Sequence, residues 1–443
     1  MNLTSNNNKP SVDDFPHDFM TQYQRQNGGL FVHVFLAAYI FTALAMVCDG
    51  YFIPSLEQFS RKLHLSSDVA GATLLATGGS VPSLFTSVIG VFITKNEIAL
   101  GAIAGSGIFN SLFVVAICGL FAGTVLRLKP WPLLRNCVCY VLSISVLIVV
   151  SHDKKVYWYE ALVLVTMYLM YVVVMYFNTT LEKYYEKLTG YKTQINNDFG
   201  ERIDEKTSLL MTNSQNSTRL SSRREGNETE ESNQSVDHIH HSPFSVPRGI
   251  ISKTWWVIKL PITCLFYMTI PDCRKIRWGE WYLFSFFISM TWIGLLTYVL
   301  VWMVSIIGFT LGIPNVIMSM TVLAAGSSGP DVTSSLIVAR QGNGDMAVSN
   351  CIGSNIFDIL LCLGLPWLAK SLLEGSTGYV EVQNSGMIYV LFILIAAVLV
   401  VPLLTKVNKW NLNKCLGVTF LFFYPIFIAV SIILANKCGD ESL

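Results

Sequence analysis

Two aspartates stand inside long apolar runs of the sequence. Asp331 follows the segment GSSGP (326–330), and Asp358 lies within GSNIFDILLCLGLPW (353–367). A carboxylate in hydrocarbon costs about 2.5 kcal/mol or more, so an aspartate in such a run indicates a functional site. Carboxylate, hydroxyl and carbonyl oxygens are the hard ligands that Na⁺, K⁺ and Ca²⁺ take in proteins. The two aspartates therefore predict a cation-binding site.

Polar side chains accompany both aspartates at helical spacing. Ser335 follows Asp331 by one turn and Ser354 precedes Asp358 by one turn, so each pair shares a helix face. The predicted cation ligands are Asp331, Asp358, Ser83, Thr77, Ser80, Ser87, Asn110, Ser328, Ser335 and Ser354. Close helix packing uses the same small residues and is the competing interpretation, but it does not account for the acids. Asp49, at the end of an earlier apolar run, fits either a functional acid or a residue in interfacial water.

The passage around Asp331 and Asp358 is the second copy of an internal repeat. Residues 71–112 recur as residues 319–360 with a constant offset of 248 positions and no gap. Gly78, Ser80, Pro82, Ser87, Gly105, Ser106, Ile108 and Phe109 recur as Gly326, Ser328, Pro330, Ser335, Gly353, Ser354, Ile356 and Phe357. At one pair the copies differ, because Ser83 stands where Asp331 stands in the second copy. Two interrupted hydrophobic segments at corresponding places in two halves predict a transport site between repeats.

Glycine and proline interrupt one apolar run of each repeat at the same place. Proline removes an amide donor and clashes with the preceding turn, while glycine permits a distorted backbone. The residues predicted to kink or break the two helices are Gly78, Gly79, Pro82, Gly326, Gly329 and Pro330. Irregular backbone survives in a membrane only where it lines a cavity or is buried in protein. We therefore expect free carbonyls and the neighbouring hydroxyls to converge near the centre of the membrane.

The composition places these elements in a membrane. Of 443 residues, 52% are hydrophobic and 13% are charged, which excludes an ordinary soluble protein. About ten runs reach the roughly 20 residues that cross a bilayer: 31–51, 69–93, 98–121, 133–151, 157–177, 281–307, 312–338, 346–369, 386–405 and 415–436. They form two groups of five, and because five is odd the second group has the opposite orientation. The predicted fold is an all-α, multi-pass membrane protein with two inverted five-helix repeats, in an intracellular organelle membrane or the plasma membrane.

Five regions follow from this pattern. They are an extramembrane segment (1–30), a first membrane half (31–177), a disordered cytosolic loop (178–252), an interfacial segment (253–278) and a second membrane half (279–443). Within the loop, Glu205, Leu209 and Leu210 fit an acidic dileucine motif, which predicts a sorting adaptor as partner. Two leucines in a polar loop arise equally well by chance, so this interpretation stays open.

Other functions have little support. A net charge of +1 without a basic face argues against nucleic-acid binding, and ten scattered cysteines without metal-ligand spacing predict small buried side chains. No cofactor is expected besides the transported Na⁺, Ca²⁺ and K⁺, and the remaining partner is membrane lipid. Gly342-Asn343-Gly344-Asp345 matches the GxGD tetrapeptide of intramembrane aspartyl proteases, but it lies in a short turn and no Tyr-Asp pair occurs, so an enzyme is not predicted.

Several motifs give the chain a family resemblance. They are CDGYFIPSL (48–56), DVAGATLLATGGSVPSLFTSVIGVFI (68–93), VYWYEALVLV (156–165), PDCRK (271–275), LVWM (300–303) and GNGDMAVSNCIGSNIFDILLCLGLPW (342–367). The chain resembles a potassium-dependent sodium/calcium exchanger, most like the branch that works in intracellular membranes. The resemblance implies alternating access and exchange of Na⁺ against Ca²⁺ with K⁺. It also implies that Asp331 binds Ca²⁺ and Na⁺ and that Asp358 is tied to K⁺ dependence.

Two positions depart from that family pattern. The family has an acid where this chain has Ser83, and an acid is often found where it has Gly50. Two carboxylates leave Ca²⁺ plus K⁺ with one unbalanced positive charge, so we expect weak calcium binding or an altered stoichiometry. A non-transporting homologue that regulates a true exchanger remains the alternative.

Overall fold

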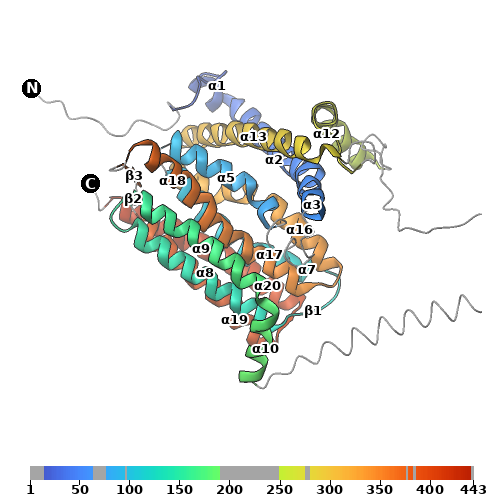
Figure 1. Ribbon diagram of the computed structural model, residues 1–443. Coiled ribbons are helices and arrows are strands. Elements are labelled where there is room, and N and C mark those ends of the chain that lie inside the picture. Colours follow the sequence, from blue (N-terminus) through green and yellow to red (C-terminus); the bar gives the residue numbers. More distant parts are fainter. Residues whose placement is uncertain are drawn as a thin grey trace, which may run out of the picture. The chain divides into compact units, whose positions relative to one another are not determined.

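The computed structural model describes residues 14–62, 76–94, 97–189, 249–274, 280–375, 378–382 and 386–440. The chain forms two compact units: the first contains residues 1–177 and 264–443, and the second contains residues 178–263. The first unit carries both repeats and is almost entirely helical (Figure 1). The predicted all-α class is confirmed.

The first half begins with a short turn and a long apolar helix. In order, its elements are α1 (Gln22–Gln24), η2 (Arg25–Gly29), α2 (Leu30–Val47), η3 (Cys48–Phe52), α3 (Ile53–Lys62), α5 (Ala76–Phe92), α6 (Glu97–Ile108), η5 (Phe109–Val114), α7 (Val115–Phe121), β1 (Leu126–Arg127), α8 (Pro130–Ser151), β2 (Lys155–Tyr157) and α9 (Trp158–Tyr176). The η elements are π-helical turns, which add a residue to one helical turn and often occur at functional sites.

The second half repeats this order. Its elements are α13 (Tyr282–Leu311), α14 (Asn315–Met318), η7 (Ser319–Leu323), α15 (Ala324–Ser327), α16 (Gly329–Arg340), α17 (Gly344–Phe357), η8 (Asp358–Leu363), α18 (Gly364–Leu373), β3 (Tyr379–Glu381), α19 (Met387–Val407), β4 (Asn411–Leu412) and α20 (Lys414–Asp440). The π-helical turns η5 and η8 occupy nearly the same place in the two copies of the repeat. Helix α13 packs along α2, and α19 packs between α8 and α20.

Two small sheets show that the halves are inverted. Strand β1 pairs with β4, and β2 pairs with β3, both antiparallel. Helix α8 runs from β1 to β2, whereas α19 runs from β3 to β4. Because the paired strands bring these ends together, α8 and α19 cross the protein in opposite directions. The inverted arrangement expected from an odd number of spans per half is therefore present.

Eight helices in the described part are long and apolar enough to cross a membrane. The other two predicted spans contain the shorter apolar helices Gly78–Phe92 and Asn315–Ser327. These are the two runs that carry the Gly and Pro interruptions. The spans predicted from hydropathy therefore each coincide with helix in the described residues.

The second unit contains helix α10 (Asn178–Thr189) and most of α12 (Ile250–Thr269). The prediction of disorder from residue 178 is wrong for α10, because Leu181, Tyr184 and Leu188 recur at helical spacing among strong helix formers. Helix α12 covers much of the predicted interfacial segment 253–278. Residues 190–248, with the predicted sorting residues Glu205, Leu209 and Leu210, lie outside the described residues.

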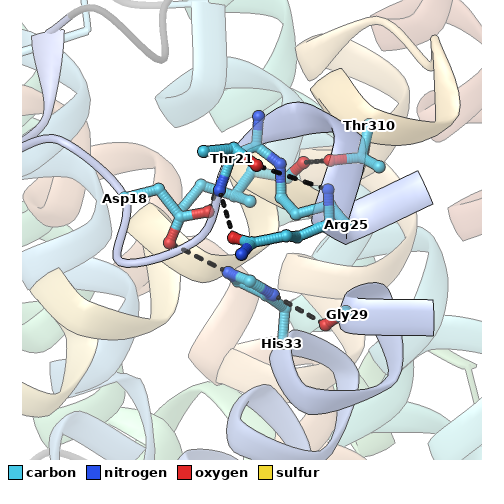
Figure 2. A network of polar contacts seen from close by, with 8 residues as sticks. Asp18, Thr21, Arg25, Gly29, His33 and Thr310 are labelled. Atoms are coloured by element: carbon cyan, nitrogen blue, oxygen red, sulfur yellow. Dashed lines mark hydrogen bonds and ion pairs between the residues drawn. The ribbon is translucent and has the colours of Figure 1, made fainter. Parts of the chain in front are cut away.

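The described part of the N-terminal segment is tied to α2 by a polar network (Figure 2). Asp18 Oδ2 lies 2.6 Å from Arg25 Nη1, and Asp18 Oδ1 lies 3.1 Å from His33 Nε2. His33 Nδ1 lies 3.1 Å from the carbonyl oxygen of Gly29. Thr21 and Gln24 form a capping box that starts α1. The segment before the first span is therefore folded onto that span.

Candidate functional site

Both predicted acids are buried at irregular points of their helices. Asp331 is in the first turn of α16 and is 3% exposed; Asp358 opens the π-helical turn η8 and is 1% exposed. Ser328, with φ −85° and ψ 4°, separates α15 from α16, and Pro330 stands in the first turn of α16. Proline is favoured there because that amide has no partner inside the helix. The second break predicted from Gly326, Gly329 and Pro330 is thus observed at Ser328.

The first interrupted segment, predicted to be kinked or broken, has no break within the described residues. Helix α5 continues through Gly78, Gly79 and Pro82 without interruption. A single proline removes one i to i−4 hydrogen bond, and the Thr86 hydroxyl donates to the Pro82 carbonyl over 2.9 Å. The two glycines serve packing instead. A Cβ on Gly78 would lie 3.0 Å from Ile53 Cγ1, and a Cβ on Gly79 would collide with Asp331 Oδ1.

Asn110 joins the two repeats at the site. Its Nδ2 lies 3.0 Å from Asp331 Oδ2, 3.0 Å from Asn355 Oδ1 and 3.4 Å from Ser354 Oγ. An amide has two hydrogens, so it donates to two of these three acceptors at once. Asn110 is the repeat equivalent of Asp358, and a neutral amide of the first repeat therefore faces the acid Asp331 of the second.

Asp358 has the corresponding partner. Ser83, the repeat equivalent of Asp331, lies beside the Asp358 carboxylate. Asp358 accepts a hydrogen bond from Ser106 Oγ over 3.0 Å. Exchanging the two halves converts the pair Ser83–Asp358 into Asp331–Asn110, and it converts Ser106–Asp358 into Ser354–Asn110. The polar contacts thus follow the pseudo-two-fold relation between the repeats. Each acid of the second repeat meets a neutral residue of the first.

Several buried oxygens of the site have no hydrogen-bond donor among the described residues. They are Asp331 Oδ1, Asn110 Oδ1, Ser87 Oγ and Ser328 Oγ. Buried polar atoms in proteins are nearly always hydrogen-bonded, so such a group needs an explanation. Carboxylate, amide and hydroxyl oxygens with free lone pairs form the ligand set of Na⁺, K⁺ and Ca²⁺. Within the described ranges, no group of three or more His, Cys, Asp or Glu side chains forms a site for a resident metal.

The predicted ligands are brought together only in part. Asn110 contacts Asp331 and Ser354, and Ser83 lies beside Asp358. Ser80 lies near Asp358, but its buried Oγ has no hydrogen-bond partner among the described residues. Ser335 instead accepts from Asn350 Nδ2 over 3.0 Å and from Cys351 Sγ over 3.3 Å, so it braces α16 against α17. The side chain of Thr77 lies outside the described residues.

The sequence interpretation missed Asn355 as a member of the site. Asn355 accepts from Asn110 over 3.0 Å, and its Nδ2 lies 3.4 Å from both the Gly107 carbonyl and Ser111 Oγ. Since Asn355 is the repeat equivalent of Gly107, this contact lies on the pseudo-two-fold axis. The signal in the sequence was a polar amide, Asn355, inside the apolar run that contains Asp358. The repeat pairs Asn355 with Gly107, so the comparison of the two copies did not mark it as a site residue.

The tetrapeptide that resembles a protease motif has a structural role. Asp345 Oδ1 accepts from the Lys129 backbone amide over 2.6 Å at the start of α17. It therefore ties the turn before α17 to the segment between β1 and α8. Its carboxylate is engaged away from Asp331 and Asp358.

The fold and the site define a multi-pass membrane transporter of cations, built from two inverted repeats. Residues 33–177 and 281–433 match the family described as sodium/calcium exchanger protein, and the chain belongs to this family. The resemblance inferred from the motifs is confirmed.

Curated relatives align over nearly the whole chain. Human sodium/potassium/calcium exchanger 3 is 37% identical and covers 97% of this chain and 84% of its own length. Human sodium/potassium/calcium exchanger 5 is 37% identical, with 95% and 86% covered, and mouse exchanger 4 is 36% identical, with 98% and 86% covered. A solved structure of the sodium-calcium exchanger NCX_Mj is similar at a TM-score of 0.48 and 20% identity, over 90% of this chain and 98% of that one.

Proposed function

We propose that the chain is a secondary active antiporter that exchanges Na⁺ for Ca²⁺ at the buried site between its repeats, with K⁺ as a co-transported ion. One observation carries the proposal: Asp331 and Asp358 are both buried, and each faces a neutral residue of the opposite repeat. Inverted repeats provide alternating access, because exchanging the conformations of the two halves opens a central site to the other side. The names of the relatives support Na⁺, K⁺ and Ca²⁺ as the ions.

The charges of the site decide how the ions are coupled. Two carboxylates balance one Ca²⁺ or two Na⁺, whereas Ca²⁺ together with K⁺ leaves one unit of positive charge. Two unit charges ~4 Å apart interact with about 4 kcal/mol at an effective dielectric constant of about 20, so one missing carboxylate changes ion binding by an energy of that order. Ser83, in place of the acid expected from the family, therefore predicts a weaker K⁺ requirement or a lower calcium affinity.

The test is Na⁺-gradient-driven ⁴⁵Ca²⁺ uptake into proteoliposomes with and without K⁺. We expect K⁺ to stimulate wild-type transport, and Ser83→Glu to increase that stimulation. Ser83→Gln is the matched control, because it adds a side chain of the same length as glutamate without adding charge. Equal rates and equal K⁺ dependence in wild type and Ser83→Glu would contradict the charge argument.

The same assay separates the antiporter from a regulatory homologue. A wild-type protein without Na⁺, K⁺ or Ca²⁺ flux that associates stably with a competent exchanger would favour the regulatory role. The sites at Asp331 and Asp358 favour transport, because a scaffold has no need for buried carboxylates that cost folding free energy.

We also propose a sorting signal in the polar loop, carried by Glu205, Leu209 and Leu210. The acidic residue four positions before two leucines supports recognition by a sorting adaptor. Replacement of both leucines by alanine should move the protein from internal membranes to the cell surface. An unchanged distribution of a tagged protein would argue against it.

A further inference from the structure

A third carboxylate lies beside the helix that carries Asp331. Asp49 stands in the π-helical turn η3 and is half-buried. Its Oδ2 accepts from Thr333 Oγ1 over 3.2 Å, and its backbone carbonyl accepts from Arg274 Nη2 over 2.7 Å. Thr333 is exposed and follows Asp331 by two residues in α16. An exposed hydroxyl and a half-buried acid thus stand next to the buried site.

Helix packing fixes this neighbourhood. A Cβ on Gly326 would collide with the ring of Phe41, so α2 lies directly against α15 at the break. Asp49 follows Phe41 by about two helical turns. Thr333 follows Gly326 by seven residues, across the break at Ser328. The two helices therefore run alongside each other, and they present Asp49 and Thr333 together at the end of the shared stretch.

Among the described residues, the Asp49 carboxylate has one side-chain donor, the Thr333 hydroxyl. Thr333 has one hydroxyl hydrogen, and besides Asp49 Oδ2 it reaches the Pro330 carbonyl over 2.9 Å and the Gly329 carbonyl over 3.4 Å. A carboxylate offers about four acceptor positions, so within the described part of the chain one shared donor leaves most of them open. In the same turn of α16, Asp331 Oδ1 is buried and has no donor among the described residues. Among the described residues, both carboxylates, the half-buried Asp49 and the buried Asp331, therefore have oxygen lone pairs that accept no hydrogen bond.

We propose that Asp49 and Thr333 form an outer cation site, where a hydrated divalent cation pairs with carboxylate and hydroxyl before it reaches Asp331. The inference rests on the proposed function of Asp331 as an ion ligand. Asp49 supplies charge at the outer site and does not enter the charge count of the inner one. Arg274, beside the same turn, competes electrostatically with the arriving cation.

The decisive variant is Asp49→Asn, because an asparagine oxygen still accepts from Thr333 while the charge is lost. We expect the calcium concentration at half-maximal effect to rise about tenfold, the loss expected when a hydrated divalent cation about 6 Å away loses one opposite charge in water. Maximal flux should stay unchanged. Asp49→Glu should restore wild-type behaviour, and Asp153→Asn, which removes an exposed carboxylate elsewhere, should have no effect.

Two measurements are made on each purified variant: thermal stabilisation by Ca²⁺ in detergent, and ⁴⁵Ca²⁺ uptake in proteoliposomes. An Asp49→Asn protein with unchanged half-saturation in both would overturn the outer site. Stabilisation without uptake in wild type would refute the antiporter, yet the binding shift in Asp49→Asn would still test the outer site. A wild-type protein that Ca²⁺ does not stabilise would overturn this inference too.

Discussion

Asn110 donates from Nδ2 to Asp331 Oδ2 across 3.0 Å, and this bond joins the first repeat to the acid of the second. A buried carboxylate oxygen that loses its donor costs about 1–3 kcal/mol. We therefore expect Asn110→Leu to lower the free energy of unfolding by about that amount. Thermal unfolding in detergent, without added Ca²⁺, measures it.

The control for this variant is Ser87→Ala, which removes a buried hydroxyl that has no partner in the described part of the chain. Because no hydrogen bond is lost, the variant should not lower the free energy of unfolding. If both variants lose the same stability, the bond between Asn110 and Asp331 does not hold the repeats together.

Each of the two buried acids should be required for calcium transport. Asp331→Asn and Asp358→Asn each halve the negative charge that faces a divalent ion, while they keep the size of the side chain. We expect Na⁺-driven ⁴⁵Ca²⁺ uptake at low Ca²⁺ to fall by about tenfold or more, which corresponds to about 1.4 kcal/mol of lost binding. Full uptake in either variant would place the transport site elsewhere.

The network around Asp18 predicts a dependence of stability on pH. Burial raises the pKa of Asp18, but hydrogen bonds and charge from His33 and Arg25 outweigh it, so the pKa lies below its ordinary value of 3.8. A depressed carboxyl pKa stabilises the folded state above the ordinary value, and the stabilisation is lost as the pH falls through the folded-state pKa.

Asp18→Asn removes this contribution. The variant should unfold at a lower temperature than wild type near pH 7, and the difference should shrink below about pH 4. Thermal unfolding from pH 3 to pH 7 is the measurement. A difference that stays constant over that range would mean that the carboxylate charge of Asp18 does not stabilise the segment.

The fold and the two acids could be predicted because they depend on local signals. Long apolar runs give the spans, an odd number of spans per half gives inversion, and an acid inside a run marks the site. The contacts Asn110–Asp331 and Ser83–Asp358 could not be predicted. A repeat offset tells which residues are equivalent, but contact depends on where the pseudo-two-fold axis lies, and helix packing determines that position.

The two copies of the repeat also show why similar motifs can fold differently. Both carry glycine and proline at matching positions, yet the chain breaks at Ser328 and α5 continues through Pro82. In the second copy Gly329 precedes the proline directly, whereas Val81 does so in the first. Ser335 is a second example. Helical spacing places it on the same face of α16 as Asp331, but its hydroxyl accepts a hydrogen bond from Asn350 of α17, and spacing alone does not predict that partner.

Gly79 provides the last prediction, because it lets the backbone of α5 approach Asp331. A Cβ at this position would collide with Asp331 Oδ1, and the helix around it is buried. Gly79→Ala should therefore displace the carboxylate and lower ⁴⁵Ca²⁺ uptake by about tenfold, although alanine is the better helix former by about 1 kcal/mol. Gly78→Ala is the matched control, since the nearest atoms to its Cβ would belong to Ile53 and Leu56 and not to an acid, so most of the uptake should remain. If the two variants transport equally well, close contact between α5 and Asp331 is not needed for ion binding.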